Sequence, residues 1–252
     1  MKPDRAPPHR RARRAPRGFG LVEILLTLTF GLLLVAAIGS WSVAHIGEQR
    51  RLLAQARLSQ DLRAVIDLVG RDLRRAGHWG HAERGVWTGG DAAPTPNPYT
   101  GLHPGAGAPS TSLGHAYSRE ADDNGLVDAN ERYGLRLNPS SGALEWRVSG
   151  AAIAPGSSDQ WQALTDPAAL QVTQLQIRHE VDSLDLLAHC ARPSCPSPAD
   201  PAAPACPPRL LLHRVTITLE GRDARDATLR RSLRETLRLR NEEVQGDRKS
   251  VV

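Results

Sequence analysis

The sequence predicts an α+β fold, in which one long N-terminal α-helix packs on an antiparallel β-sheet that carries long loops. The stretch from Arg17 to Ala76 contains no proline and keeps helical spacing of its apolar residues. Short segments with alternating apolar and polar residues follow it, which is typical of strands. Runs rich in proline and glycine separate these segments and predict loops, above all at 82–118 and 183–209.

The composition allows a folded domain with its own core, because 40% of the 252 residues are hydrophobic. The formal net charge of +5 is unevenly placed. Residues 1–18 carry a charge of +6, so the rest of the chain sums to −1. A basic total would suggest nucleic acid or an anionic membrane as partner, but here the excess belongs to the first segment.

The first half of the predicted helix has the composition of a membrane span. The run from Ile24 to Gly47 contains no Asp, Glu, Lys or Arg, and it is long enough to cross about 30 Å of hydrocarbon. Arginines precede it, which predicts a cytoplasmic N-terminus and a domain outside the cytoplasm. An ordinary signal peptide cleaved near Ala44 is the alternative. Against it, Glu23 interrupts the head of the apolar run, and the helical pattern continues past that point.

The second half of the helix is amphipathic and is expected to face the sheet. Its apolar residues recur at spacings of three and four. They are Leu52, Leu58, Leu62, Val65, Ile66, Val69, Leu73 and Ala76. Gly77 follows directly and is a suitable helix stop.

The residues at the start of the helix resemble the prepilin signature of type IV pilins and type II secretion pseudopilins. Gly18 and Phe19 are followed by Glu23, the fifth residue counted from the phenylalanine, in front of an apolar helix. The resemblance implies that prepilin peptidase cuts after Gly18 and methylates the new amine of Phe19. It also implies that Glu23 is a buried carboxylate.

The same resemblance implies a pilin-like fold with three segments. Residues 1–18 would be a leader peptide, residues 19–48 a transmembrane or filament-core helix half, and residues 49–252 a periplasmic globular domain. That domain would include the amphipathic helix half, 49–77.

An ionised carboxylate in an apolar setting is costly unless a cation lies close to it. In a filament, the N-terminal ammonium of a neighbouring subunit would supply that cation for Glu23 and fix the stagger between packed helices. The alternative is that Glu23 lies at the headgroup level, where an acid at a helix start is favourable to the helix dipole.

The decapeptide R-D-L-R-R-A-G-H-W-G from Arg71 to Gly80 is similar to the helix end of PilW-type minor pilins. The type II minor pseudopilin GspJ is a related family. His78 and His81 lack the i, i+4 spacing of a helical zinc pair, so packing or surface roles are favoured for them.

An acidic segment from Glu120 to Glu131 partly fits the calcium loop pattern D-x-[DN]-x-[DN]-G-x5-E. The five candidate ligands in this loop are Glu120, Asp122, Asn124, Asp128 and Glu131. Calcium is therefore a candidate cofactor. An acidic turn between strands accounts for the same residues.

The three cysteines, Cys190, Cys195 and Cys206, lie in one proline-rich insertion. Outside the cytoplasm a disulfide is the default, with the pairing open and one thiol left over. A zinc site with His189 and His213 is the alternative.

Alternating residues predict strands after the helix. The two segments 133–137 and 143–148 form a predicted hairpin around an Asn-Pro-Ser-Ser-Gly turn, and 175–181 and 215–219 are further strands. His179 falls on the apolar side and is expected to pack. The segment 229–240 fits both a helix and a strand, and the resemblance to PilW and GspJ relatives favours a strand.

These expectations lead to an assembly function. A PilW-like minor pilin would sit in the bacterial inner membrane with its C-terminal domain in the periplasm, and then help to initiate or cap a type IV pilus fibre. Its partners would be other minor and major pilins, prepilin peptidase and the pilus assembly platform. A GspJ-like pseudopilin is the alternative, and a pilus-tip module that binds DNA or a surface is an alternative of another class. Catalysis is not expected, because the chain contains no Gly-x-Ser-x-Gly, P-loop or zincin motif.

Overall fold

The computed structural model describes residues 18, 20–86, 95–119, 123–186 and 209–245. The chain divides into two units, Met1–Leu52 and Leu53–Val252. The first contains the apolar part of the long helix. The second contains the amphipathic part of the helix and all the described strands.

Helix α1 spans Leu21–Leu73 without interruption. Gly20 directly precedes it, and the Gly20 carbonyl accepts hydrogen bonds from the backbone N–H groups of Glu23 and Ile24 at 3.0 and 3.2 Å. The helix ends a few residues before the predicted stop. The chain then turns through Gly77, which has a φ of +74°, a left-handed conformation that favours glycine.

The described strands form two antiparallel sheets, where the sequence predicted one. The first sheet has the order β1-β2-β3-β4-β5. Its strands are β1 Leu102–His103, β2 Ser112–Ala116, β3 Arg132–Leu137, β4 Leu144–Ser149 and β5 Gln160–Ala163. The second has the order β6-β7-β8, and β9 also pairs with β7. Its strands are β6 Leu170–Asp185, β7 Arg209–Asp223, β8 Arg230–Arg238 and β9 Glu243–Gln245.

The prediction that 82–118 is only loop is wrong. The structure has a 3-10 helix, η1, at Ala82–Gly85, and the strands β1 and β2. Strand β2 has few residues that favour strands, and Gly114 lies at its centre. It is a strand because its whole length pairs with β3, in a register that sets Gly114 opposite Gly134. Pairing with a distant segment therefore decides this element.

The hairpin prediction is confirmed by β3 and β4, which pair from Gly134↔Arg147 to Leu137↔Leu144. The ambiguous segment near the end of the chain is the strand β8, so the choice of strand over helix is also confirmed. A further 3-10 helix, η2, at Ala129–Glu131 leads directly into β3.

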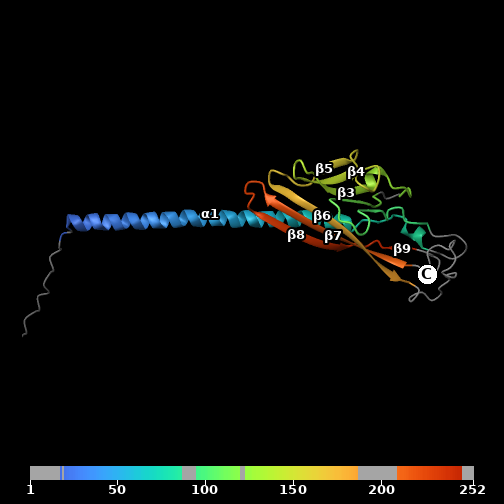
Figure 1. The fold of residues 1–252 in the computed structure, drawn as a ribbon, viewed down its shortest axis with the longest axis horizontal. Coiled ribbons are helices and arrows are strands. Elements are labelled where there is room, and N and C mark those ends of the chain that lie inside the picture. Colours follow the sequence, from blue (N-terminus) through green and yellow to red (C-terminus); the bar gives the residue numbers. More distant parts are fainter. Residues whose placement is uncertain (1–17, 19, 87–94, 120–122, 187–208, 246–252) are drawn as a thin grey trace, which may run out of the picture. The chain divides into compact units, whose positions relative to one another are not determined.

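The core lies where the amphipathic part of α1 meets both sheets. Figure 1 shows β6, β7 and β8 running along this part of the helix, with β3, β4 and β5 in a separate layer. The buried helix residues are Leu58, Leu62, Ile66, Val69, Leu73 and Ala76. They pack with residues of both sheets, among them Leu113, Leu135, Leu175, Ile177, Val215, Ile217 and Leu219. The predicted stripe is thus confirmed except at Leu52, which is exposed.

Candidate functional site

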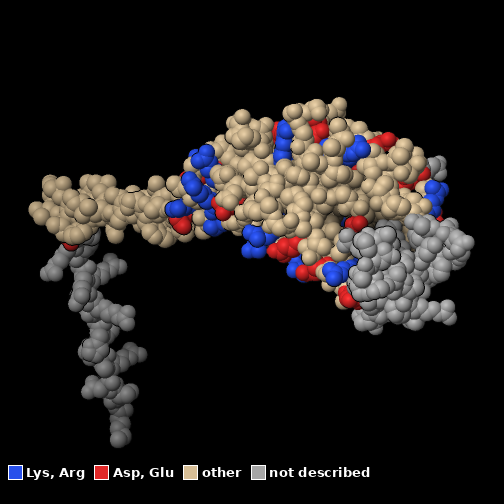
Figure 2. All heavy atoms as spheres, turned by 45° about the vertical axis from the view of Figure 1, so that its right-hand side comes forward, with Lys and Arg blue, Asp and Glu red and all other residues tan. Residues whose placement is uncertain are grey.

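The apolar part of α1 is exposed on all sides. Its large hydrophobic side chains from Leu21 to Ile46 are between 49% and 76% exposed. Figure 2 shows this part of the helix almost without charged side chains, whereas basic and acidic side chains are interspersed over the visible face of the other described residues. The helix is long and apolar enough to cross a membrane. So large an apolar surface requires lipid or other apolar helices around it.

Three of the polar side chains of this segment fit such surroundings. The hydroxyls of Thr27, Thr29 and Ser40 each donate to the carbonyl three residues earlier, at 2.8 to 2.9 Å. These groups are therefore satisfied inside the helix and need no water. Glu23, in the first turn, has no hydrogen-bond or ion-pair partner for its side chain among the residues that the structure describes.

The predicted cleavage site is only partly described. Gly18 is exposed, and nothing described lies within 4 Å of where its Cβ would be. Phe19 lies outside the described residues. Cleavage after Gly18 and methylation of Phe19 therefore stay predictions, as does the role of Glu23.

The decapeptide Arg71–Gly80 at the helix end connects α1 to strand β2 and to Tyr117, which follows β2. The Asp72 carboxylate accepts hydrogen bonds from His115 Nε2 at 2.7 Å and from the Tyr117 hydroxyl at 2.8 Å. The Arg75 guanidinium lies 4.4 Å from the centre of the Tyr117 ring, which stacks on Tyr133 at 4.1 Å. Burial, with the nearby charge of Asp72, raises the pKa of Tyr117 well above its usual range. The hydroxyl therefore stays protonated and keeps donating.

The turn after the helix is held by two asparagine side chains. Asn241 Nδ2 donates to the Ala76 carbonyl at 2.8 Å, and Asn97 Nδ2 donates to the Gly77 carbonyl at 2.8 Å. These bonds satisfy carbonyls that the end of the helix leaves free. A Cβ at Gly77 would lie 3.1 Å from the Cβ of Asn241, so glycine is also required by the close approach.

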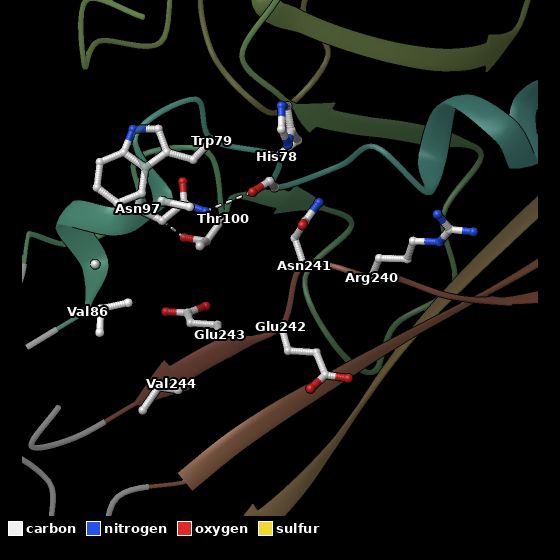
Figure 3. A pocket seen from close by; sticks show the side chains of 13 residues that line it. His78, Trp79, Val86, Asn97, Thr100, Arg240, Asn241, Glu242, Glu243 and Val244 are labelled. Atoms are coloured by element: carbon white, nitrogen blue, oxygen red, sulfur yellow. Dashed lines mark hydrogen bonds between the residues drawn. The ribbon is translucent and has the colours of Figure 1, made fainter. Parts of the chain in front are cut away.

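A pocket of about 540 Å³ opens beside this turn, with the Trp79 ring on its border (Figure 3). It is lined by Gly77, His78, Trp79, Ala82, Gly85, Val86, Asn97, Thr100 and the segment 240–244. Trp79 is buried, while His78 is exposed. His81 does not converge with His78 on a metal, because His81 Nε2–H donates to the Asp123 carbonyl at 2.9 Å.

The described part of the acidic loop is held by hydrogen bonds within the protein. The Glu131 carboxylate accepts from the backbone N–H groups of Arg119 and Asp128, each at 3.0 Å, and from the Tyr99 hydroxyl at 3.0 Å. The bond from Asp128 is part of a capping box at the start of η2. Asn124 Nδ2 donates to Asp128 at 3.0 Å.

Asp123 is a buried member of this loop that the sequence reasoning missed. Its carboxylate accepts from the backbone N–H groups of Gly125 at 2.7 Å and Gly80 at 3.1 Å, and it lies 3.2 Å from the Tyr99 hydroxyl. Burial by itself would raise the pKa of Asp123, but these hydrogen bonds outweigh it and lower the pKa. A buried acid among turn residues gives no periodic signal in a sequence.

Two of the predicted calcium ligands, Glu120 and Asp122, lie outside the described residues. Within the described part of the chain, no group of three or more His, Cys, Asp or Glu side chains is arranged to hold a metal ion. Calcium binding stays a prediction that the described geometry does not test.

The cysteine insertion, with Cys190, Cys195, Cys206 and His189, also lies outside the described residues. The disulfide and zinc alternatives therefore stay open.

The other histidine of the zinc alternative, His213, faces His179. His213 Nδ1 lies 3.0 Å from His179 Nε2. His179 Nδ1–H donates to the Pro104 carbonyl at 3.0 Å, which leaves its Nε2 as acceptor for His213 Nδ1–H. Burial lowers the pKa of both histidines, so the neutral pair is favoured.

A comparison with known families supports the resemblance found in the sequence. The family model described as prepilin peptidase-dependent protein B matches residues 51–239. The match begins in the amphipathic part of α1 and ends just after β8, so it does not include the segment around Gly18 and Glu23. No curated protein and no solved structure matches the chain significantly.

Proposed function

Because the chain belongs to the family of prepilin peptidase-dependent protein B, we propose that it is a PilW-like minor pilin that takes part in the assembly and initiation of a type IV pilus. The family membership and the pilin-like layout of one long apolar helix and antiparallel sheets place it among pilin-type and pseudopilin-type proteins. The narrower assignment to the PilW group rests on the decapeptide at the helix end.

The observation that carries this proposal is a lone acid in the first turn of an exposed apolar helix. Glu23 is the only Asp, Glu, Lys or Arg side chain between Leu21 and Gly47. It lies where the prepilin signature has its glutamate, in a segment that the family match does not cover. The signature and the family match are therefore two independent supports for a role in pilus or pseudopilus assembly, and neither separates a PilW-like from a GspJ-like protein.

In the proposed sequence of events, the protein is first a single-pass protein of the inner membrane with its C-terminal domain in the periplasm. Prepilin peptidase removes residues 1–18, and Phe19 becomes the methylated N-terminus. The apolar helix then moves from lipid into the fibre core, where Glu23 pairs with the N-terminal ammonium of another pilin. Both environments exclude water, so the exposed apolar surface of α1 is covered throughout.

The test is a Glu23→Ala variant of the full chain. It is expected to insert into the inner membrane at the wild-type level and to fail to support pilus assembly, because the charge pair that fixes the stagger is lost. Glu48→Ala is the matched control, since it removes an acid from the same helix just beyond the apolar run, and it should leave piliation unchanged. Normal piliation with Glu23→Ala would refute the proposed role.

Cleavage is tested separately by replacing Gly18 with tryptophan. The leader should then remain attached, and N-terminal sequencing should find residues that precede Phe19. A mature chain that still begins with Phe19 would contradict the cleavage assignment.

The second candidate is a minor pseudopilin of a type II secretion system, which the same family membership and fold support. Deletion of the gene distinguishes the two, because a pseudopilin is needed for secretion and a minor pilin for piliation. A third candidate is a pilus-tip module that binds DNA or a surface. It predicts salt-dependent binding of duplex DNA by the full chain in detergent, and no binding at low salt would exclude the DNA form of it.

A further inference from the structure

The outer face of the second sheet, formed by β6, β7 and β8, carries no part of the core. The register sets Arg178 of β6 opposite Thr216 of β7, and Gln176 opposite Thr218. Thr218 in turn is opposite Arg234 of β8. Alternation along the strands sends these side chains away from α1, because Ile177, Ile217 and Leu219 between them are buried in the core.

A hollow of about 180 Å³ lies at the centre of this face. Its lining consists of six polar side chains from three strands, namely Gln176, Arg178, Glu180, Thr216, Thr218 and Arg234. Arg178 borders the hollow from β6 and Arg234 borders it from β8, the two strands on either side of β7. Their two guanidinium groups can therefore reach one small group that is placed between them.

Several hydrogen-bond donors around the hollow are free. Within the described part of the chain, the side chains of Arg178, Arg234, Gln176 and Thr218 have no hydrogen-bond or ion-pair partner. The neighbouring arginines of the same face differ. Arg214 pairs with Asp182 at 2.7 Å and with Glu180 at 3.8 Å, Arg222 Nε donates to Gln171 at 3.0 Å, and Arg238 pairs with Glu242.

The net charge of the lining residues indicates which ligand charge the hollow can accommodate. Two arginines and Glu180 give the hollow a net charge of +1. One negative charge balances it, whereas a doubly charged phosphate would leave an excess negative charge beside Glu180, which Arg214 offsets only in part because it lies 3.8 Å from Glu180 and pairs more closely with Asp182. A carboxylate matches the charge, and its two oxygens accept from the planar fork of a guanidinium.

We propose that this hollow is a binding site for a carboxylate, and that its ligand is an aspartate or glutamate side chain presented by a partner protein. Arg178 and Arg234 supply the charge, and Gln176 and Thr218 add neutral donors. This proposal does not rest on the proposed pilus function, because it is argued from the lining of the hollow alone, and it is tested on the isolated chain.

The test uses the full chain in detergent micelles, with its arginines labelled with nitrogen-15. The probe is the blocked tripeptide acetyl-Gly-Glu-Gly-amide, and acetyl-Gly-Gln-Gly-amide is the neutral control. The Nε–H signals of Arg178 and Arg234 should shift and saturate with the Glu peptide, and they should not move with the Gln peptide.

Variants then separate the site from general charge effects. The double change R178Q/R234Q should weaken binding by roughly tenfold or more, equivalent to about 1.4 kcal/mol. R230Q is the matched control, because Arg230 is on the same sheet and its Nε donates to the Ala227 carbonyl outside the hollow. It should change binding less than about twofold.

Three outcomes would overturn the proposal. The first is the absence of a saturable shift with the Glu peptide in the wild type, which requires no variant to fold. The second is an equal loss of binding in R230Q, which would mean a diffuse charge effect. The third is tighter binding of inorganic phosphate or duplex DNA that is lost in R178Q/R234Q, which would assign the hollow to phosphate groups instead.

Discussion

The most informative test of the fold concerns a buried ion pair between β4 and the loop that precedes β5. Arg147 Nε lies 2.9 Å from Asp159 Oδ2, and the side chains are 0% and 2% exposed. The guanidinium also donates to the carbonyls of Ala152 and Ile153. Asp159 in turn accepts from the Gly156 N–H at 2.6 Å. The pair thus holds the loop 150–159 against the first sheet.

Asp159→Ala should leave the Arg147 guanidinium buried without a counter-charge. Loss of one partner of a buried ion pair costs about 3–5 kcal/mol. For a domain of 150–250 residues, each kcal/mol lowers the unfolding midpoint by roughly 2–4 °C. The expected decrease is therefore roughly 6–20 °C, which is well above the error of a melting experiment.

The measurement is thermal unfolding of the full chain in detergent, followed by near-ultraviolet circular dichroism. Asp182→Ala is the control, because its ion pair with Arg214 is about half exposed, at 56% and 47%. An exposed pair contributes about 0–1 kcal/mol, so the control should change the midpoint by a few degrees at most. Equal effects of the two variants would refute the argument that burial makes the Asp159 pair important.

The difference between wild type and Asp159→Ala should also depend on pH. Burial would raise the pKa of Asp159, but the Gly156 N–H and the Arg147 charge outweigh it and lower the pKa. The carboxylate therefore stabilises the folded state fully above its unfolded pKa of about 3.9, and this contribution is lost as pH falls through the lower folded value. The difference in midpoint should be constant near neutral pH and shrink below about pH 4.

Two further predictions concern glycine and histidine. Gly77→Ala should destabilise by about 1–2 kcal/mol in thermal melting, because φ is +74° and the new Cβ would press on Asn241. Gly105→Ala, where nothing lies within 4 Å, should change stability by less than about 0.5 kcal/mol, and a similar loss at both positions would contradict the conformational argument. The His179–His213 pair predicts acid sensitivity, because burial lowers both pKa values and the unfolded chain takes up protons first. Stability should be full above about pH 6.5 and fall as pH decreases from there through the folded pKa values. His213→Gln should flatten this dependence between pH 7 and 5, and an unchanged slope would show that other groups cause it.

The sequence alone was sufficient for features that depend on local spacing. The absence of proline and the apolar positions from Leu58 to Ala76 predict a long helix and its buried side, because helical periodicity is set by residues three and four apart. Alternation predicts the hairpin of β3 and β4 for the same reason. The position of Glu23 relative to Gly18 and Phe19 is likewise a matter of spacing, and it carries the proposed function without any tertiary contact.

The tertiary structure alone decided which polar residues meet. Asp72 and His115 are 43 residues apart, and nothing local shows that β2 places the imidazole against the helix end. The same holds for β2 itself, which is a strand through its pairing with β3, and for the hollow between Arg178 and Arg234. Alternation along β6 sends Arg178 away from the core, because Ile177 and His179 beside it are buried, but only the register of three strands places a second free arginine, Arg234, on the other side of β7. Local propensity acts over a few residues, whereas these sites form from side chains that only folding brings together.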